Sequence, residues 1–159
     1  MPVRKSPGYY ERKLIAGALA GTLFFLLLVF IQPLPIDTPA SGWSNSLQRF
    51  TNAIPVYMMY ITPVAIIYFV LTSLISDRAA RYLTRRKNGH NEWLFSLIFH
   101  LIFGLILFWY TLAAALFFFV IDRMLKKWRD RYSYKHVLLA MVVPFFTWFI
   151  FMMIAFLKG

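Results

Sequence analysis

Residues 93–121, WLFSLIFHLIFGLILFWYTLAAALFFFVI, form an apolar stretch of 29 residues without a formal charge. Basic segments flank it on both sides, RAARYLTRRK at residues 78–87 and RMLKKWRDRYSYK at residues 123–135. An apolar stretch of this length belongs in a lipid bilayer. Cationic loops normally stay on the cytoplasmic side, so a segment that simply crosses should not be basic at both ends. The fold therefore depends on how this stretch meets the membrane.

The composition indicates an integral membrane protein. Of the 159 residues, 60% are hydrophobic and 14% are charged, which is more apolar surface than a soluble domain of this size could bury. Four spans of about 20 residues use most of the length, so no separate soluble domain fits. The formal net charge is +11, and its cations lie beside apolar stretches, where they contact lipid headgroups and set orientation. We expect no nucleic-acid binding, because no soluble module presents these cations.

Three other apolar stretches complete an expected all-α bundle of four transmembrane helices in a single membrane domain. Residues 14–31 follow a basic start and exceed the apolar length of a signal peptide, so they predict an uncleaved first span with its N-terminus inside. Residues 53–76 predict a second span that is kinked at Pro55 and Pro63. Residues 137–157 predict the last span.

The two basic loops, residues 77–92 and 122–136, are expected at the membrane surface. In the first, the helix should continue into water, with Asp77 and Arg81 forming an exposed i,i+4 pair. In the second, apolar and basic residues separate onto different faces, which predicts a basic interfacial helix. The lipid bilayer is the expected partner, and the cations predicted to contact anionic lipid headgroups are Arg78, Arg81, Arg85, Lys126, Lys127 and Arg131.

Two topologies compete for residues 93–121. If all four stretches cross with the N-terminus inside, 10 Lys or Arg lie inside and 7 outside; if this stretch returns as a shallow hairpin, 15 lie inside and 2 outside. Charge favours the hairpin. However, two full crossings need about 40 residues, and a turn within the membrane needs partners for its backbone groups although only Gly104 interrupts the apolar run. We therefore favour one crossing helix with both termini cytoplasmic, and keep the hairpin as the alternative.

His100 is the only ionisable residue deep inside an expected span. An ionisable group at such a depth usually faces a partner or a water-filled cavity. We favour a structural hydrogen bond to Ser96 or to a neighbouring helix over a proton or ligand site. The three histidines show no metal-binding spacing, the chain has no cysteine, and no hydrolase or phosphate-binding motif occurs. We expect no metal site, no cofactor and no enzymatic activity.

Gly17 and Gly21 form a GxxxG motif in the first span. Small residues at this spacing let two helix backbones approach closely within lipid. The motif fits packing against another span of the same chain as well as it fits a homodimer.

Two short stretches, LTSLISD at residues 71–77 and HLIFG at residues 100–104, resemble an uncharacterised family of small four-span membrane proteins from bacilli. The resemblance implies a multi-pass architecture in a bacterial plasma membrane and implies no particular activity.

The favoured function is a non-enzymatic membrane protein that packs with itself or with another membrane protein in an accessory role, such as stress adaptation or immunity. The alternative is a small oligomeric transporter or channel subunit that uses His100 together with Tyr57, Tyr60 or Tyr68. No span offers a carboxylate for coupled cation transport, which counts against the alternative.

Overall fold

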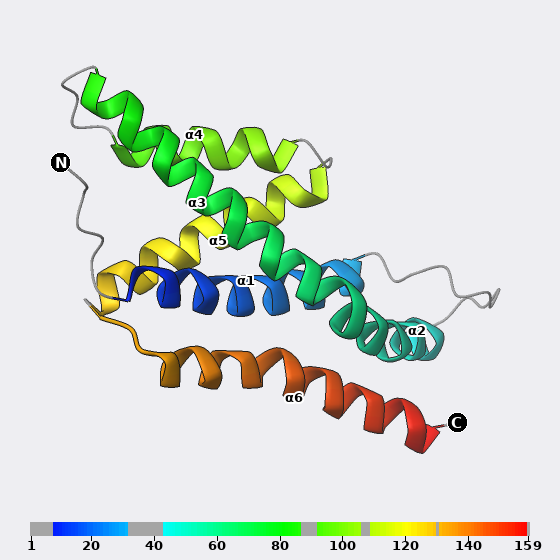
Figure 1. Cartoon of the computed structure of the whole chain (residues 1–159). Helices are drawn as coiled ribbons and strands as arrows, with labels where there is room; N and C mark the ends of the chain where they lie inside the picture. Colours follow the sequence, from blue (N-terminus) through cyan, green and yellow to red (C-terminus); the bar gives the residue numbers. More distant parts are fainter. Residues whose placement is uncertain (1–7, 32–42, 87–91, 106–108, 130, 159) are drawn as a thin grey trace.

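The computed structural model describes residues 8–31, 43–86, 92–105, 109–129 and 131–158, and within these ranges it is helical without a strand. The elements in chain order are α1 (Tyr9–Ile31), α2 (Trp43–Val56), η1 (Tyr57–Ile61), α3 (Thr62–Arg86), α4 (Glu92–Leu105), α5 (Trp109–Trp128) and α6 (Tyr134–Lys158). Figure 1 shows α6 on one side of α1, with α3, α4 and α5 on the other.

Three stretches of helix are long and apolar enough to span a membrane: Tyr9–Ile31, Gln48–Thr84 and Tyr134–Leu157. The expected spans 14–31, 53–76 and 137–157 lie inside them. Trp93–Leu105 is a shorter apolar helix. The expected all-helical fold is therefore confirmed, with three stretches that are compatible with membrane spans.

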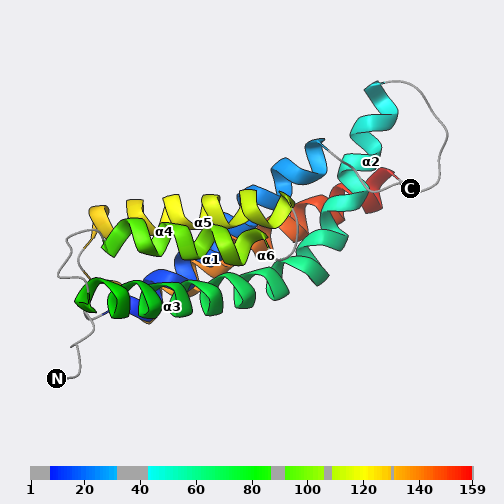
Figure 2. The same ribbon diagram turned by 90° about the horizontal axis from the view of Figure 1, so that it is seen from above.

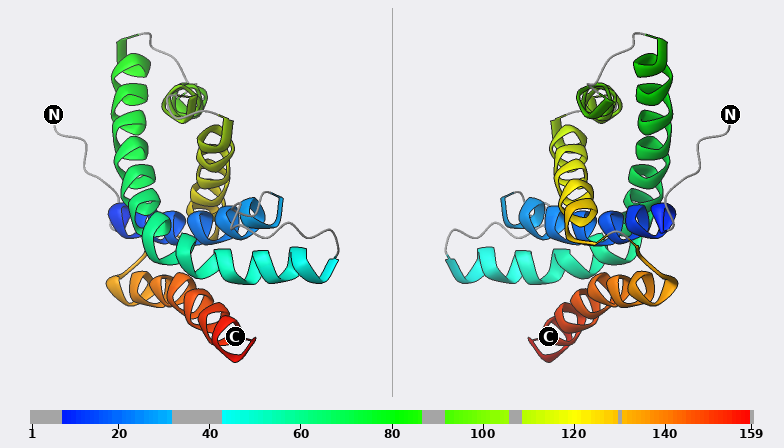
Figure 3. Two further views of the ribbon diagram at one scale, coloured as in Figure 1. Left: turned by 90° about the vertical axis from the view of Figure 1, so that its right-hand side faces the viewer. Right: turned by 90° about the vertical axis from the view of Figure 1, so that its left-hand side faces the viewer.

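The expectation of one continuous helix over residues 93–121 is wrong. The stretch is divided between α4, which ends at Leu105, and α5, which begins at Trp109. The two helices pack against each other, and Figure 3 shows α4 end-on between α3 and α5. At 1.5 Å per residue, the 14 residues of α4 extend about 21 Å, which is less than the roughly 30 Å of the hydrocarbon core. The pair is a helical hairpin.

Side chains of the same chain supply donors to two of the backbone carbonyls that end α4. The last four carbonyls of a helix have no partner within it, and hydrocarbon offers none. The Tyr68 hydroxyl donates to the Phe103 carbonyl at 2.8 Å, and the Thr111 hydroxyl donates to the Gly104 carbonyl at 2.7 Å. Side chains of α3 and α5 thus supply the hydrogen-bond donors whose apparent absence argued against a hairpin.

Gly104 lets the two legs of the hairpin approach closely. A Cβ atom at this position would lie 3.0 Å from the Cα of Leu112 and 3.0 Å from the Cβ of Ala115. Ala114 and Ala115 are themselves buried. Small residues on both legs therefore make this contact, as is common between helices in membranes.

One end of the bundle gathers the start of α1, the end of α3, the start of α4, the end of α5 and the start of α6. We call it the basic end, because both basic segments lie there (Figures 1 and 2). The end of α6 lies at the opposite end, on the same side as the end of α1. The start of α1 and the end of α6 therefore lie at opposite ends of the molecule, which differs from the expected placement of both termini on one side.

The second basic loop is also arranged differently from the expectation. Residues 122–128 continue α5, and α6 begins at Tyr134 after a short non-helical connection, so no separate interfacial helix occurs over residues 122–136 among the described positions. In the first basic loop, α3 continues to Arg86, in agreement with the predicted extension of the second helix.

Candidate functional site: a buried charge cluster at the basic end

Four charged side chains meet inside the basic end, and we call them the charge cluster: Arg12, Lys13, Asp77 and Asp122. Lys13 is fully buried, and its Nζ lies 2.8 Å from an oxygen of Asp77 and 2.8 Å from an oxygen of Asp122. The Nε of Arg12 donates to the other oxygen of Asp122 at 2.8 Å. Two cations thus balance two carboxylates, as burial in a medium of low polarity requires.

Neutral donors complete the hydrogen bonding of Asp77. The Tyr9 hydroxyl donates to Oδ2 at 2.8 Å, and the Ser96 hydroxyl donates to Oδ1 at 2.7 Å. The cluster and these two donors come from α1, α3, α4 and α5, so one network joins four helices. This network fixes the open end of the hairpin to the first two spans.

Aromatic rings surround the cations of this end. Lys13 Nζ lies 5.6 Å from the centre of the Tyr9 ring and 5.8 Å from the centre of the Phe118 ring, within the range of cation–π attraction. The guanidinium of Arg81 lies 5.8 Å from the Tyr9 ring centre. The predicted surface pair of Asp77 with Arg81 is wrong, because the carboxylate turns inward to Lys13.

The connection between α5 and α6 is fixed to the start of α1. Gly8 has a φ of +81°, which favours glycine, and a Cβ there would overlap with the backbone of Tyr132. The Tyr132 hydroxyl donates to the carbonyl of Leu125 at 2.7 Å. Burial is the main cause that raises the pKa of this hydroxyl, so it stays protonated and continues to donate.

His100 lies in α4 one turn deeper than Ser96, and both are buried. Nδ1 of His100 lies 2.7 Å from the backbone carbonyl of Ser96, while the Ser96 hydroxyl binds Asp77. The imidazole ring stacks on Phe118, with ring centres 6.1 Å apart, and meets Phe119 edge-on. Nε2 of His100 has no partner among the described residues.

Gly17 and Gly21 face α3 of the same chain. A Cβ at Gly17 would lie 3.3 Å from a side-chain atom of Ile66, and a Cβ at Gly21 would lie 3.7 Å from another. Both glycines are buried in this contact. The motif therefore packs two helices within one molecule.

The residues predicted to contact lipid headgroups lie at the basic end. Arg78, Lys126, Lys127 and Arg131 are exposed, and Arg81 is half-buried. The side chain of Arg85 lies outside the described part of the chain.

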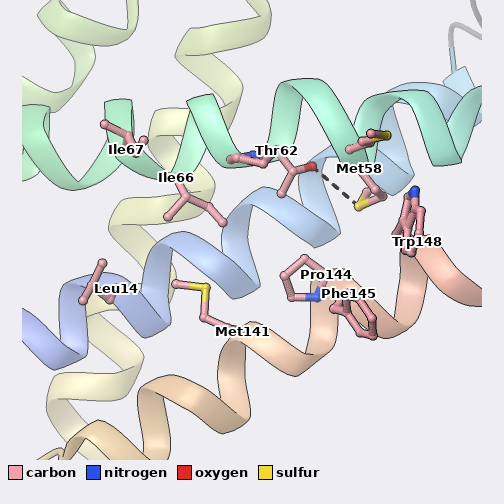
Figure 4. Close-up of a pocket in the computed structure, with 11 residues that line it drawn as sticks. Leu14, Met58, Thr62, Ile66, Ile67, Met141, Pro144, Phe145 and Trp148 are labelled. Carbon is pink, nitrogen blue, oxygen red and sulfur yellow. Dashed lines mark hydrogen bonds between the residues drawn. The ribbon is translucent and has the colours of Figure 1, made fainter.

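A lateral groove of about 600 Å³ runs between α3, η1 and α6, with α1 as its floor (Figure 4). Pro63 and Pro144 line it from opposite sides, and Leu14, Met141 and Trp148 extend along it. The lining is almost entirely apolar. A second apolar cavity, of about 240 Å³, lies beside the tip of the hairpin and includes Tyr68 and Thr111. Neither of these two cavities is lined by His100.

Within the described residues, no group of three or more His, Cys, Asp or Glu side chains could hold a metal ion. Comparison of the chain with protein families, with curated proteins and with solved structures gives no match. The resemblance to a four-span family from bacilli therefore remains an expectation.

The charge cluster was not predicted from the sequence, although a signal for it was present. Arg12 and Lys13 immediately precede the first apolar stretch, Asp77 immediately follows the second, and Asp122 immediately follows residues 93–121. In the hairpin topology these borders all meet at one end of the bundle, so their opposite charges can pair. The crossing topology would have placed Asp122 at the other end.

Proposed function

We propose that this chain is a membrane protein of three spanning helices and one re-entrant hairpin, with its basic end in the cytoplasm. The observation that carries the proposal is the salt-bridged contact of Arg12 and Lys13 with Asp122. This contact brings the second basic segment to the end where α1 starts, and the salt bridge of Lys13 with Asp77 brings the first. The charge rule then favours a cytoplasmic basic end, because 15 of the 17 Lys and Arg residues belong to that side. The end of α6 then faces outward.

The function proposed with this topology is non-enzymatic. Described polar residues hold helices together: the charge cluster and Ser96 join four helices, and Tyr68 and Thr111 close the hairpin. The chain acts by packing in a bacterial plasma membrane, where its exposed cations hold anionic lipid and its apolar faces contact lipid or another membrane protein.

The extent of the exposed apolar surface supports this proposal. Exposed large apolar residues continue along α6, including Leu139, Phe146, Phe149 and Phe156. In water such a surface would be an aggregation hazard, whereas in a bilayer it contacts hydrocarbon or a partner helix. The alternative transporter gains no support from the positions of its residues, since Tyr60 is exposed on the outer surface and the Tyr68 hydroxyl is bound at the hairpin tip.

Because the chain has no cysteine, single introduced thiols can test the topology. Ser133→Cys reports the basic end and Gly159→Cys reports the end of the chain. With a membrane-impermeant maleimide on intact bacteria, we expect Gly159→Cys to react and Ser133→Cys to react only after permeabilisation. A crossing of residues 93–121 would give the opposite pattern at both positions. Reaction of both thiols from outside would also overturn the proposal.

A further inference from the structure

Ser73 and His100 are two buried polar residues, each with one side-chain atom that has no hydrogen-bond partner among the described residues. Ser73 is fully buried and His100 is 4% exposed. The hydroxyl of Ser73 and Nε2 of His100 make no hydrogen bond to any described atom. Leaving a buried polar group unsatisfied costs stability, so each such group needs an explanation.

Ser73 differs from the other hydroxyl residues of its helix. The hydroxyls of Thr72, Ser76 and Thr84 each donate to the carbonyl one turn back in α3, as Ser and Thr commonly do in helices. The corresponding carbonyl for Ser73 is that of Phe69, which accepts from Thr72 at 3.2 Å instead. The Ser73 hydroxyl does not make this bond and remains free to bind another group.

The register of α3 against α4 places the two unpartnered groups opposite each other. Ser96 of α4 binds Asp77 of α3 directly. Ser73 precedes Asp77 by four residues in α3, and His100 follows Ser96 by four residues in α4. Residues four apart share a helix face, so we infer that Ser73 and His100 face each other one turn deeper. Deeper still, Tyr68 of α3 binds the Phe103 carbonyl of α4, which confirms the antiparallel register.

The chemistry of His100 determines what can bind there. Nδ1 lies against a carbonyl, which only accepts, so Nδ1 carries the proton and Nε2 of the neutral ring is an acceptor. A ligand must therefore donate to Nε2, while Ser73 can donate or accept. One nitrogen and one hydroxyl are too few ligands for a metal ion. A cation would also be repelled by Lys13, which lies against Phe118 as His100 does.

We propose that Ser73 and His100 bind one small neutral hydrogen-bonding molecule, of the size of water, between α3 and α4. Lys13, which uses two of its Nζ protons on Asp77 and Asp122, belongs to the network that binds Ser96 one turn away in α4. A buried water typically makes about two to four hydrogen bonds, and Ser73 and His100 offer two of them. The site links His100 to the charge cluster and does not depend on which side of the membrane the basic end faces.

A double-mutant cycle in the full chain, reconstituted in lipid nanodiscs, tests the proposal through the unfolding constant. With a ligand in place, we expect Ser73→Ala to raise that constant roughly 5- to 30-fold, and to have little effect in a His100→Phe background. If the site is dry, Ser73→Ala removes an unpaired group and leaves the constant unchanged or lower. Ser76→Ala is the matched control, because Ser76 is also fully buried and its hydroxyl is satisfied.

A measurement on the unsubstituted protein covers the case in which His100→Phe does not fold. In protein with ¹⁵N-labelled histidine, we expect the His100 ring to show magnetisation transfer from a long-lived water within the nanodisc. Ser73→Ala should abolish this transfer. Absence of the transfer in the original protein, or its persistence in Ser73→Ala, would overturn the proposal.

Discussion

Single residues at the basic end decide whether the hairpin stays attached to the spans. Asp122 neutralises Arg12 and Lys13 together, so Asp122→Asn leaves two buried cations with one carboxylate. Removal of one partner from a buried ion pair costs about 3–5 kcal/mol. We expect a loss of this size in the free energy of unfolding, measured by denaturant titration in micelles. Glu11→Gln, at a partly exposed position of α1 beside Arg12, should change this free energy by less than about 0.5 kcal/mol.

Gly104 and Gly21 differ in the space that surrounds an added Cβ atom. A methyl group on Gly104 would meet the Leu112 backbone at 3.0 Å, and backbone atoms cannot move aside easily. Gly104→Ala should therefore destabilise the fold by about 1–3 kcal/mol. Gly21→Ala adds a methyl group at ordinary contact distance, 3.7 Å from Ile66, and gains helix propensity of up to about 1 kcal/mol. Equal effects of the two substitutions in the same unfolding assay would contradict this account of the hairpin.

The tip of the hairpin depends on the hydroxyls of Tyr68 and Thr111. Thr111→Val keeps the shape of the side chain but leaves the Gly104 carbonyl without the donor seen in the structure. We expect a loss of about 1–2 kcal/mol in the free energy of unfolding. The control is Thr147→Val in α6, where the hydroxyl bonds within its own helix. Faster proteolysis at the end of α4 in Thr111→Val than in the control would locate the effect at the tip.

The hairpin also shows what the sequence could and could not predict. Hydropathy found the helical content and three spans, because length and apolar composition alone determine them. It could not divide residues 93–121, because the signal was a contact between distant residues: Tyr68 supplies a donor that the local sequence lacks. The charge counts pointed to the hairpin, and the objection to it failed because Tyr68, from outside the stretch, and Thr111, from its opposite leg, supply the partners. His100 was identified from its depth, whereas Ser73, its proposed partner in binding, needed the register of α3 against α4.

The lateral groove between α3, η1 and α6 can be tested for a bound lipid chain. Ile67 lines it and is exposed, so Ile67→Trp should fill it without disturbing the core. If an acyl chain occupies the groove, this variant retains fewer phospholipids after extraction in mild detergent, as counted by native mass spectrometry. Leu139→Trp places the same ring at an exposed position outside the groove lining and serves as the control. Equal lipid retention by the two variants would show that the groove holds no lipid of its own.

For the whole molecule, the distribution of charge predicts a preference for anionic lipid. Lys126, Lys127 and Arg131 are exposed at the basic end, and a cation close to an anionic surface contributes about 1 kcal/mol. Each change to Gln should therefore lower the enrichment of phosphatidylglycerol over phosphatidylcholine by about fivefold, measured among co-purified lipids at low salt. The effect should weaken as ionic strength rises, because salt screens exposed charges. Arg49→Gln, in α2 at the opposite end, should leave the enrichment unchanged. A similar loss in Arg49→Gln would mean that net charge, and not its concentration at one end, sets the preference.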